Sequence, residues 1–327
     1  MSEPLLQVED LKIEFRTSRG TLQALSGISF DVLPGEVFGL VGETGCGKTV
    51  TGLGVLRLVP KPGKITAGRI LLRGDDLLAK SDREMQQIRG GQIAMIFQDP
   101  ASSLNPVFTL GSQIARVIRQ HQNVTAREAN RQVVATLEAV GLPDAERLMD
   151  SYPHELSGGM QQRAMIAMAL ACQPALLIAD EPTTALDVTI KAQILTLLRE
   201  LQARFNLALL LITHDLGVVA EMCDRLAVLY AGHIAETGTL ADIFSASQHP
   251  YTRGLMSAIP RRDSRGKPLT AIRGAVPHNP GTLVGCPFES RCDFAFDHCR
   301  AERPPLMRVE KNHLSACWLL QPDGGAR

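Results

Sequence analysis

Residues 42–49 read Gly-Glu-Thr-Gly-Cys-Gly-Lys-Thr and fit the pattern G-x-x-x-x-G-K-[ST] of a phosphate-binding loop. A loop that wraps a triphosphate with its backbone N–H groups needs residues without a Cβ, because the chain must bend with positive φ and approach the oxygens closely. Lys48 can reach the β- and γ-phosphates of a bound nucleotide, and the Thr49 hydroxyl can sit on Mg²⁺. The predicted nucleotide-binding residues here are Gly42, Glu43, Thr44, Gly45, Cys46, Gly47, Lys48 and Thr49.

The segments on either side of this loop support the same interpretation. Residues 37–41 form a short apolar run that predicts a buried strand. Residues 49–58 predict a helix whose N-terminus faces the phosphates, where free N–H groups and the helix dipole favour an anion. The alternative is a glycine-rich turn that matches the pattern by chance, and the flanking strand and helix disfavour it.

A second apolar run, residues 176–179, ends in two carboxylates, Asp180 and Glu181. A buried strand would deliver Asp180 to the end of a parallel sheet, where ligands gather in α/β folds and the carboxylate can hold Mg²⁺. Glu181 points elsewhere and can polarise an attacking water as a general base. A solvated acidic loop is the alternative, and the presence of Lys48 earlier in the chain disfavours it.

Residues 156–162, Leu-Ser-Gly-Gly-Met-Gln-Gln, stand at the start of a predicted helix. Ser157 offers a hydroxyl, and Gly158 and Gly159 open backbone N–H groups at the helix N-terminus, where an anion can bind. Because it lies between the phosphate loop and the aspartate-ended strand, this segment resembles the LSGGQ-type signature of ATP-binding-cassette (ABC) ATPases. Met160 replaces the usual glutamine, but the Ser-Gly-Gly core is intact.

The resemblance implies an α/β P-loop fold and an ATPase site with named roles. Gln98 would match the glutamine that senses Mg²⁺ and faces a transmembrane partner, so that Thr49, Gln98 and Asp180 together would hold Mg²⁺. His214, after an apolar strand, would match the switch histidine that contacts the γ-phosphate. Catalysis would then depend on Glu181, His214 and Gln98.

The resemblance also implies a partner ATPase. Residues 185–187, Ala-Leu-Asp, would form the loop that crosses a dimer interface at Asp187, and Phe15 would stack on adenine unless it is simply a core residue. The chain has one phosphate loop and one signature, and in ABC ATPases the signature of one subunit closes on the ATP held by the other. Ser157, Gly158 and Gly159 would therefore act in trans, on the nucleotide of a second subunit.

Composition is typical of a globular enzyme. The 327 residues support one core domain plus a smaller appendage, and a hydrophobic content of 45% suits a sizeable core. Lys+Arg and Asp+Glu balance at 34 each, which argues against a nucleic-acid partner. We find no apolar stretch long enough to span a bilayer and no signal peptide, so we expect a cytoplasmic protein that reaches a membrane only through partners.

We expect the chain to divide into an ABC ATPase domain over residues 1–260 and a C-terminal extension over residues 261–327. Within the ATPase domain, strand-like runs dominate as far as about residue 100 and would include an antiparallel β subdomain. From about 101 to 172 the pattern is helical, which predicts a helical subdomain inserted between the two halves of the core. A polar segment over residues 261–268 predicts a linker before the extension.

The extension holds four cysteines, Cys286, Cys292, Cys299 and Cys317. Disulfides are unfavourable in a reducing cytosol. The spacing lacks the tight C-x₂₋₄-C knuckle of structural zinc and is wider than ferredoxin spacings, so spacing alone identifies neither metal. Four thiols in a segment with little core of its own nevertheless suggest a metal that staples it, with four free thiols as the alternative.

The extension and several core segments resemble the oligopeptide/dipeptide/nickel importer ATPases, closest to the dipeptide-permease D-type subunits. The resemblance covers nearly the whole chain and implies that the four cysteines hold a 4Fe–4S cluster, with Zn²⁺ as the alternative. It rests on residues 248–255 (Gln-His-Pro-Tyr-Thr-Arg-Gly-Leu), 274–277 (Gly-Ala-Val-Pro), 96–100 (Ile-Phe-Gln-Asp-Pro), 103–106 (Ser-Leu-Asn-Pro) and 152–155 (Tyr-Pro-His-Glu).

For this family the resemblance implies import of dipeptides or short oligopeptides, driven by ATP hydrolysis at the cytoplasmic face of the bacterial inner membrane. The implied partners are a second, distinct ATPase subunit, two permease subunits and a periplasmic peptide-binding protein. Nickel, glutathione or an opine remains possible as cargo, because other subunits would read the cargo. A soluble ABC ATPase of DNA repair or translation is a rival that the uninterrupted cassette and the balanced charge disfavour.

Overall fold

The computed structural model describes residues 3–18, 20–99, 103–184, 186–258, 272–277 and 283–321. Three features singled out in the sequence lie outside these ranges, namely the polar linker at 261–268, Pro100 and Ala185. The predicted domain boundary near residue 260 also falls outside them.

The chain forms two compact units. The first unit comprises Met1–Glu3, Leu33–Gly35 and Ala79–Leu211, and the second comprises Pro4–Val32, Glu36–Leu78 and Ile212–Arg327. The phosphate loop, His214 and the four C-terminal cysteines belong to the second unit, whereas Gln98, Asp180, Glu181 and the signature belong to the first.

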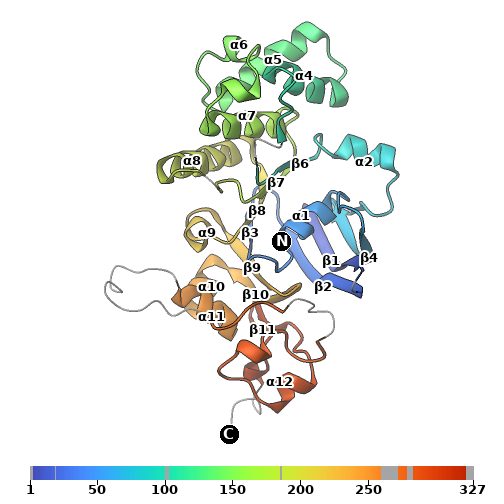
Figure 1. Cartoon of the computed structure of the whole chain (residues 1–327), viewed down its shortest axis with the longest axis vertical. Helices are drawn as coiled ribbons and strands as arrows, with labels where there is room; N and C mark the ends of the chain where they lie inside the picture. The colour runs from blue at the N-terminus through green and yellow to red at the C-terminus, as the bar shows by residue number, and fades with distance from the viewer. Residues whose placement is uncertain are drawn as a thin grey trace. The chain divides into compact units, whose positions relative to one another are not determined.

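An antiparallel sheet of the order β2-β1-β4-β5 lies in the second unit, as the sequence predicts for the β subdomain (Figure 1). Leu6 of the central strand pairs with Val32 on one side and with Leu72 on the other. Buried and more exposed side chains alternate along this strand, because one face of the sheet packs on the core. The strands are β1 (Leu6–Thr17), β2 (Gly20–Val32), β4 (Gly63–Leu72) and β5 (Asp75–Asp76).

The other sheet of the second unit combines core strands with the end of the chain, in the order β11-β12-β10-β9-β3. The parallel pair β3 and β9 is almost wholly buried, as expected for strands covered on both faces. The C-terminal strands β11 and β12 continue this sheet beyond β10. The strands are β3 (Val37–Val41), β9 (Arg225–Tyr230), β10 (His233–Thr239), β11 (Met307–Glu310) and β12 (His313–Ser315).

Short helices complete the second unit. One of them begins at Lys48, directly after the phosphate loop, as the sequence predicts. The helices are α1 (Lys48–Val55), α9 (Leu216–Met222), α10 (Leu240–Ala246), α11 (Pro250–Ser257) and α12 (Asp297–Ala301), with single 3-10 turns η4 (Glu289–Arg291) and η5 (Trp318–Leu320).

In the first unit, buried parallel strands carry the predicted carboxylates. β6 (Ile93–Ile96) pairs in parallel with β7 (Leu176–Asp180), and β8 (Ala208–Thr213) follows β7 in the same sheet and crosses into the second unit after Leu211. All residues of these three strands are buried. The apolar runs before Gln98 and before Glu181 are therefore strands, as predicted.

The first unit contains a group of packed helices between β6 and β7, as the sequence predicts for the helical subdomain. Thr109 caps α4, and Thr125 forms a capping box with Glu128 at the start of α5. α4 and α5 pack on each other and on the signature helix α7. The helices of this unit are α2 (Asp82–Ile88), α4 (Leu110–His121), α5 (Ala126–Ala139), α6 (Ala145–Leu148), α7 (Gly158–Leu170) and α8 (Val188–Phe205), with η1 (Pro153–Glu155).

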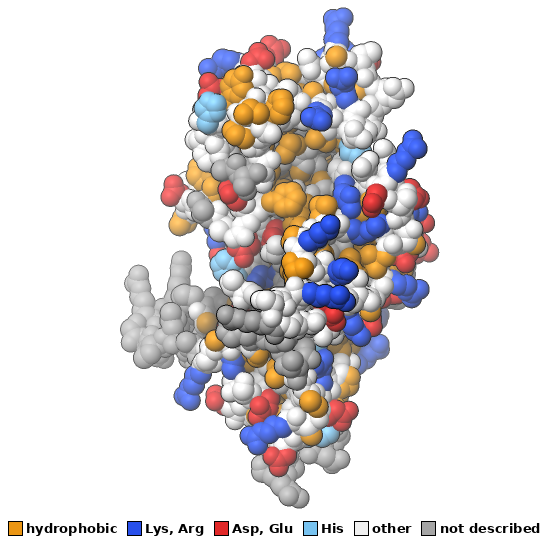
Figure 2. All heavy atoms as spheres, turned by 45° about the vertical axis from the view of Figure 1, so that its right-hand side comes forward, with side chains coloured by type: hydrophobic (Ala, Val, Ile, Leu, Met, Phe, Trp, Pro, Cys, Tyr) orange, Lys and Arg blue, Asp and Glu red, His pale blue; other side chains and the backbone are white. Residues whose placement is uncertain are grey.

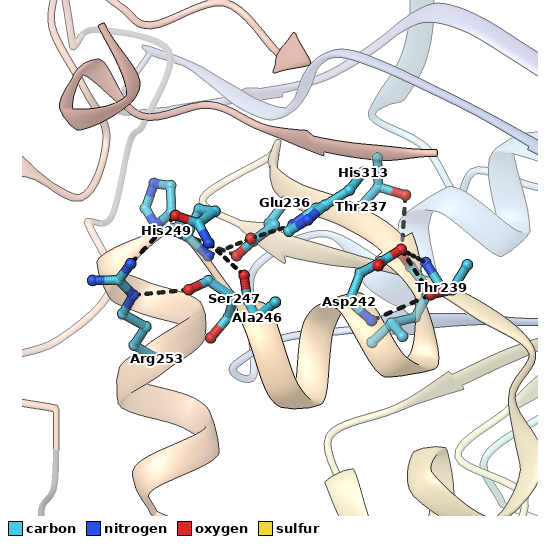
Figure 3. A network of polar contacts seen from close by, with 11 residues as sticks. Glu236, Thr237, Thr239, Asp242, Ala246, Ser247, His249, Arg253 and His313 are labelled. Atoms are coloured by element: carbon cyan, nitrogen blue, oxygen red, sulfur yellow. Dashed lines mark hydrogen bonds and ion pairs between the residues drawn. The ribbon is translucent and has the colours of Figure 1, made fainter. Parts of the chain in front are cut away.

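A buried carboxylate joins β10, β12 and the start of α11 within the second unit (Figure 3). Glu236 in β10 has a fully buried side chain, and His313 of β12 places Nε2 2.7 Å from its Oε1. The same carboxylate accepts the backbone N–H groups of Gln248, at 2.6 Å, and His249, at 3.1 Å. Three donors from two segments thus offset the cost of burying Glu236.

We predict that His313→Leu destabilises the second unit by about 3 kcal/mol, because it leaves a buried carboxylate short of one donor. The expected result is a lower thermal midpoint and faster proteolysis of the extension. Adding Glu236→Gln to this variant should recover part of the loss, since the charge is then gone. Glu310→Gln, at an exposed position of β11, is the control. An unchanged midpoint for His313→Leu would contradict the prediction.

Candidate functional site

The phosphate loop has the backbone geometry that its glycines predict. Gly42, Gly45 and Gly47 have φ values of 152°, 84° and 110°. A Cβ on Gly42 would lie 2.1 Å from the carbonyl oxygen of Leu229, so no side chain fits there. A Cβ on Gly45 would meet nothing within 4 Å, so at that position the backbone conformation alone requires glycine. The glycines thus give the loop the positive-φ backbone that can turn N–H groups toward phosphate oxygens.

Lys48 lies inside this loop at the first turn of α1. Its side chain donates to the carbonyl oxygens of Gly42, at 2.7 Å, and Glu43, at 3.1 Å. Cys46 is buried beside it, with Sγ 3.9 Å from Nζ, and burial raises the pKa of this thiol. The ammonium group is thus held on the loop by weak acceptors that phosphate oxygens can replace.

A cavity of about 460 Å³ opens in front of the loop. Gly42, Glu43 and Thr44 line one part of it, and His214 lines another, so the structure brings the predicted switch histidine to the phosphate loop. The next residue fixes this segment, because Asp215 accepts the N–H groups of Gly217 and Val218 and caps α9. Residues that sequence reasoning missed also line the cavity, namely Leu216, Leu255 and Val276.

Gln98 and Glu181, predicted from separate motifs, meet in the first unit. Gln98 Nε2 lies 3.4 Å from Glu181 Oε2, and the Thr184 hydroxyl donates to the same oxygen at 2.8 Å. Glu181 has a φ of 46°, which turns the chain sharply after β7. Asp180, at the end of that strand, is buried, with 2% of its surface exposed. Thr184 was missed, because it belongs to no motif.

The signature begins α7 as predicted. Ser157 is the N-cap, and its Oγ accepts the N–H of Met160 at 3.4 Å. A Cβ on Gly158 would meet nothing within 4 Å, whereas one on Gly159 would lie 3.2 Å from Ile190 Cγ2. The helix N-terminus is therefore open on the side of Gly158, where a phosphate of another subunit could approach. Asp187 is the exposed N-cap residue of α8.

Phe15 packs in β1 opposite Leu22 and Gly63 and is partly exposed. A Cβ on Gly63 would lie 2.6 Å from the Phe15 ring, so the glycine makes room for it. Adenine stacking remains a prediction for this residue.

The four C-terminal cysteines lie in one short segment. Cys286 donates its N–H to the carbonyl of Cys299 at 2.7 Å. Burial, together with the other cysteines nearby, raises the pKa of Cys286 to about 12 and that of Cys317 to about 11. Within the described ranges, no three His, Cys, Asp or Glu side chains form a group that could hold a metal ion. The predicted iron–sulfur or zinc site is thus not supported by this arrangement.

One feature of these cysteines still suits a thiolate ligand. Burial raises the pKa of Cys286, Cys292 and Cys317, and in each case a backbone N–H two residues further along offsets part of this increase by hydrogen-bonding the sulfur. Such bonds stabilise the charged form of a thiol.

No helix in the described part of the chain is both long and apolar enough to cross a membrane.

Comparison with known families covers both halves of the chain. Residues 25–184 match the family described as ABC transporter, and residues 235–299 match the C-terminal region of oligopeptide/dipeptide transporters. The fold also matches the dimeric structure of a bacterial ABC transporter cassette, MJ0796, with a TM-score of 0.64 and 25% identity over 72% of this chain and 98% of that one. Fold and site together define an ABC ATPase, which couples ATP hydrolysis to transport.

Similar proteins narrow the class further. The chain is 51% identical to a probable peptide ABC transporter ATP-binding protein, y4tR of Sinorhizobium fredii, over 96% of this chain and 94% of that protein. It is 48% identical to the dipeptide transport protein DppD of Bacillus subtilis (97% and 95% covered) and 47% identical to the oligopeptide transport protein OppD of that species (98% and 90%). The chain belongs to the ATP-binding subunits of the oligopeptide/dipeptide transporter family.

We predict that Gly42→Ala abolishes nucleotide binding, because its Cβ would collide with the backbone of Leu229. Gly45→Ala is the matched comparison: it has open space and should lose only about 1–2 kcal/mol of stability to its positive φ. Equilibrium binding of MgATP and thermal melting of both purified variants test this. Equal MgATP affinity of Gly42→Ala and the unmodified chain would contradict the steric account.

Proposed function

We propose that this chain hydrolyses ATP to energise the import of dipeptides or short oligopeptides. The observation that carries the proposal is the full-length similarity to proteins named for peptide, dipeptide and oligopeptide transport, together with the family match at residues 235–299. Relatives named for different peptide lengths are almost equally similar, so we propose short peptides as a class. Nickel, glutathione or an opine is the alternative cargo.

In the proposed mechanism Lys48, Thr49 and Asp180 hold MgATP, and Mg²⁺ would neutralise charge on the β- and γ-phosphates. Glu181 accepts a proton from the attacking water. The contacts from Gln98 and Thr184 support this role, because they fix the orientation of the carboxylate that must face the water. His214 would contact the γ-phosphate, which its place beside the phosphate loop supports.

We further propose that ATP binding pairs the chain with a second, related ATPase subunit. Ser157, Gly158 and Gly159 would close on the nucleotide of that partner. The open space at Gly158, at the N-terminus of α7, supports this role, because an approaching phosphate needs free N–H groups and no side chain in the way. Asp187 would lie in the same interface.

Two membrane permeases are the proposed partners of several exposed apolar side chains in the first unit. Phe97, beside Gln98, has 40% of its surface exposed, and Val107 and Phe108 have 70% and 48%. Tyr152 is exposed as well. The backbone N–H of Leu110 donates to the carbonyl of Ser151, and this bond holds the segment that contains Phe108 against the segment that contains Tyr152. Figure 2 shows hydrophobic side chains, in orange, reaching the surface on one face. Exposed apolar surface of this kind favours protein contacts.

Through these permeases the chain would sit at the cytoplasmic face of the bacterial inner membrane. A periplasmic binding protein would deliver the peptide to them. The chain itself would have no nucleic-acid partner.

For the cysteine segment we propose a 4Fe–4S cluster on Cys286, Cys292, Cys299 and Cys317, with Zn²⁺ as the alternative. The N–H groups directed at three of the sulfurs support thiolate ligands. The cluster is preferred to zinc because of the resemblance to the peptide-importer ATPases, since the cysteine spacing alone identifies neither metal. When bound, the metal would chiefly staple a segment that has little core.

We predict equal amounts of iron and acid-labile sulfide in anaerobically purified protein. Cys292→Ser should lower both and also lower the thermal midpoint, whereas Cys172→Ser, outside the segment, should leave the metal content unchanged. Zinc without iron would contradict the cluster and favour the alternative, Zn²⁺. Protein without any metal would contradict both metals and favour four free thiols.

The mechanism predicts that Glu181→Gln binds MgATP but does not hydrolyse it, because an amide cannot take the proton. In cells that carry only this variant, uptake of labelled di-, tri- and pentapeptides should fall to the level of a gene deletion. Glu138→Gln, exposed on α5, is the control. Normal ATP hydrolysis by Glu181→Gln would show that Glu181 is not the general base. Normal peptide uptake in the deletion strain, or loss of nickel uptake alone, would remove the peptide cargo.

A further inference from the structure

The C-terminal segment reaches the phosphate loop through one arginine. Arg291, in the turn η4 between Cys286 and Cys292, donates from Nη1 to Glu43 Oε2 at 2.6 Å and from Nη2 to Glu43 Oε1 at 3.0 Å. This is the two-pronged contact that a planar guanidinium makes best with a carboxylate. Glu43 is the second residue of the phosphate loop.

Arg291 is held on every side. Its Nε donates to the carbonyl of Arg273 at 2.7 Å, and Nη1 also lies 3.3 Å from the Tyr230 hydroxyl. The guanidinium lies over the rings of Tyr230 and Phe288, 5.7 and 5.8 Å from their centroids. Only 4% of the side chain is exposed, and the bonds from Glu43 raise its pKa, so it stays charged. All three guanidinium nitrogens already have partners within the protein, so we do not assign Arg291 a direct contact with phosphate.

The backbone of Glu43 is also held by the C-terminal part of the chain. Its N–H donates to the hydroxyl of Tyr251, in α11, at 3.0 Å, while its carbonyl accepts from Lys48 Nζ. The carboxylate is 30% exposed and borders the cavity in front of the loop. Left alone, this negative charge would repel a triphosphate entering that cavity.

The wall of the cavity provides independent support. Leu255 of α11 and Val276 line it together with the phosphate loop and His214. The C-terminal region therefore supplies part of the nucleotide site's surface as well as the partner of Glu43.

We propose that Arg291 is a positioning residue of the nucleotide site. It neutralises Glu43 and holds the start of the phosphate loop in the conformation that accepts MgATP. The inference rests on ATP binding by this chain and is independent of which cargo is imported.

The test is equilibrium binding of MgATP and MgADP to the full-length chain. Arg291→Met removes the charge but keeps an apolar side chain against the rings. We expect it to weaken MgATP binding about tenfold, and MgADP binding less, because the more highly charged nucleotide suffers more from an unpaired Glu43. In steady state the KM for ATP should rise more than kcat falls. Arg291→Lys should weaken MgATP binding less than Arg291→Met does, because it keeps the positive charge but loses the two-pronged contact with the Glu43 carboxylate.

Rescue separates this role from a merely structural one. Adding Glu43→Gln to Arg291→Met should restore most of the MgATP affinity and reduce the difference between MgATP and MgADP. Arg300→Met is the matched control, because Arg300 lies in the same segment and pairs with Glu289 without contacting the loop. Unchanged MgATP affinity in Arg291→Met would overturn the proposal. So would equal loss for both nucleotides with no rescue by Glu43→Gln. If Arg291→Met does not fold, Arg291→Lys and the double variant give the same comparison.

Discussion

The second unit depends on a buried carboxylate. Glu236 binds His313 of β12 and the N–H groups of Gln248 and His249. Because those two N–H groups precede α11, the contact sets where that helix begins, and α11 in turn places the Tyr251 hydroxyl on the backbone of Glu43. One buried charge, whose contacts Figure 3 shows, is thus connected through α11 to the loop that holds phosphate.

The nucleotide site could be predicted well where its residues are consecutive. The glycines of the loop at 42–49 predict its backbone conformation from the sequence alone. Glu181 and His214 each directly follow a buried strand, and this fixes their positions. The antiparallel sheet, the core strands β3, β6, β7, β8, β9 and β10 and the helical subdomain follow for the same reason, because hydrophobic period and capping residues are local signals. Thr184 could not be predicted, because a threonine after a strand has no distinguishing pattern.

Contacts between distant segments could not be read from the sequence. Arg291 and Glu43 are 248 positions apart, and neither residue type is unusual where it stands. The spacing of the cysteines likewise did not identify a metal. The backbone N–H groups near the sulfurs depend on how the chain turns after each cysteine, which the spacing does not reveal. The extension first reads as an appendage with its own metal site. The structure instead makes its strands part of a core sheet and its arginine a neighbour of the phosphate loop.

The order of strands has a consequence for how the protein is made. β10 is complete long before the ribosome has produced β12, its neighbour in the sheet. Until β12 emerges, one edge of β10 is unpaired and Glu236 lacks its contact with His313. An open edge of this kind invites pairing with other nascent chains. The sheet can therefore close only after β12 has been made, and a chain that lacks β12 would keep an unpaired edge on β10.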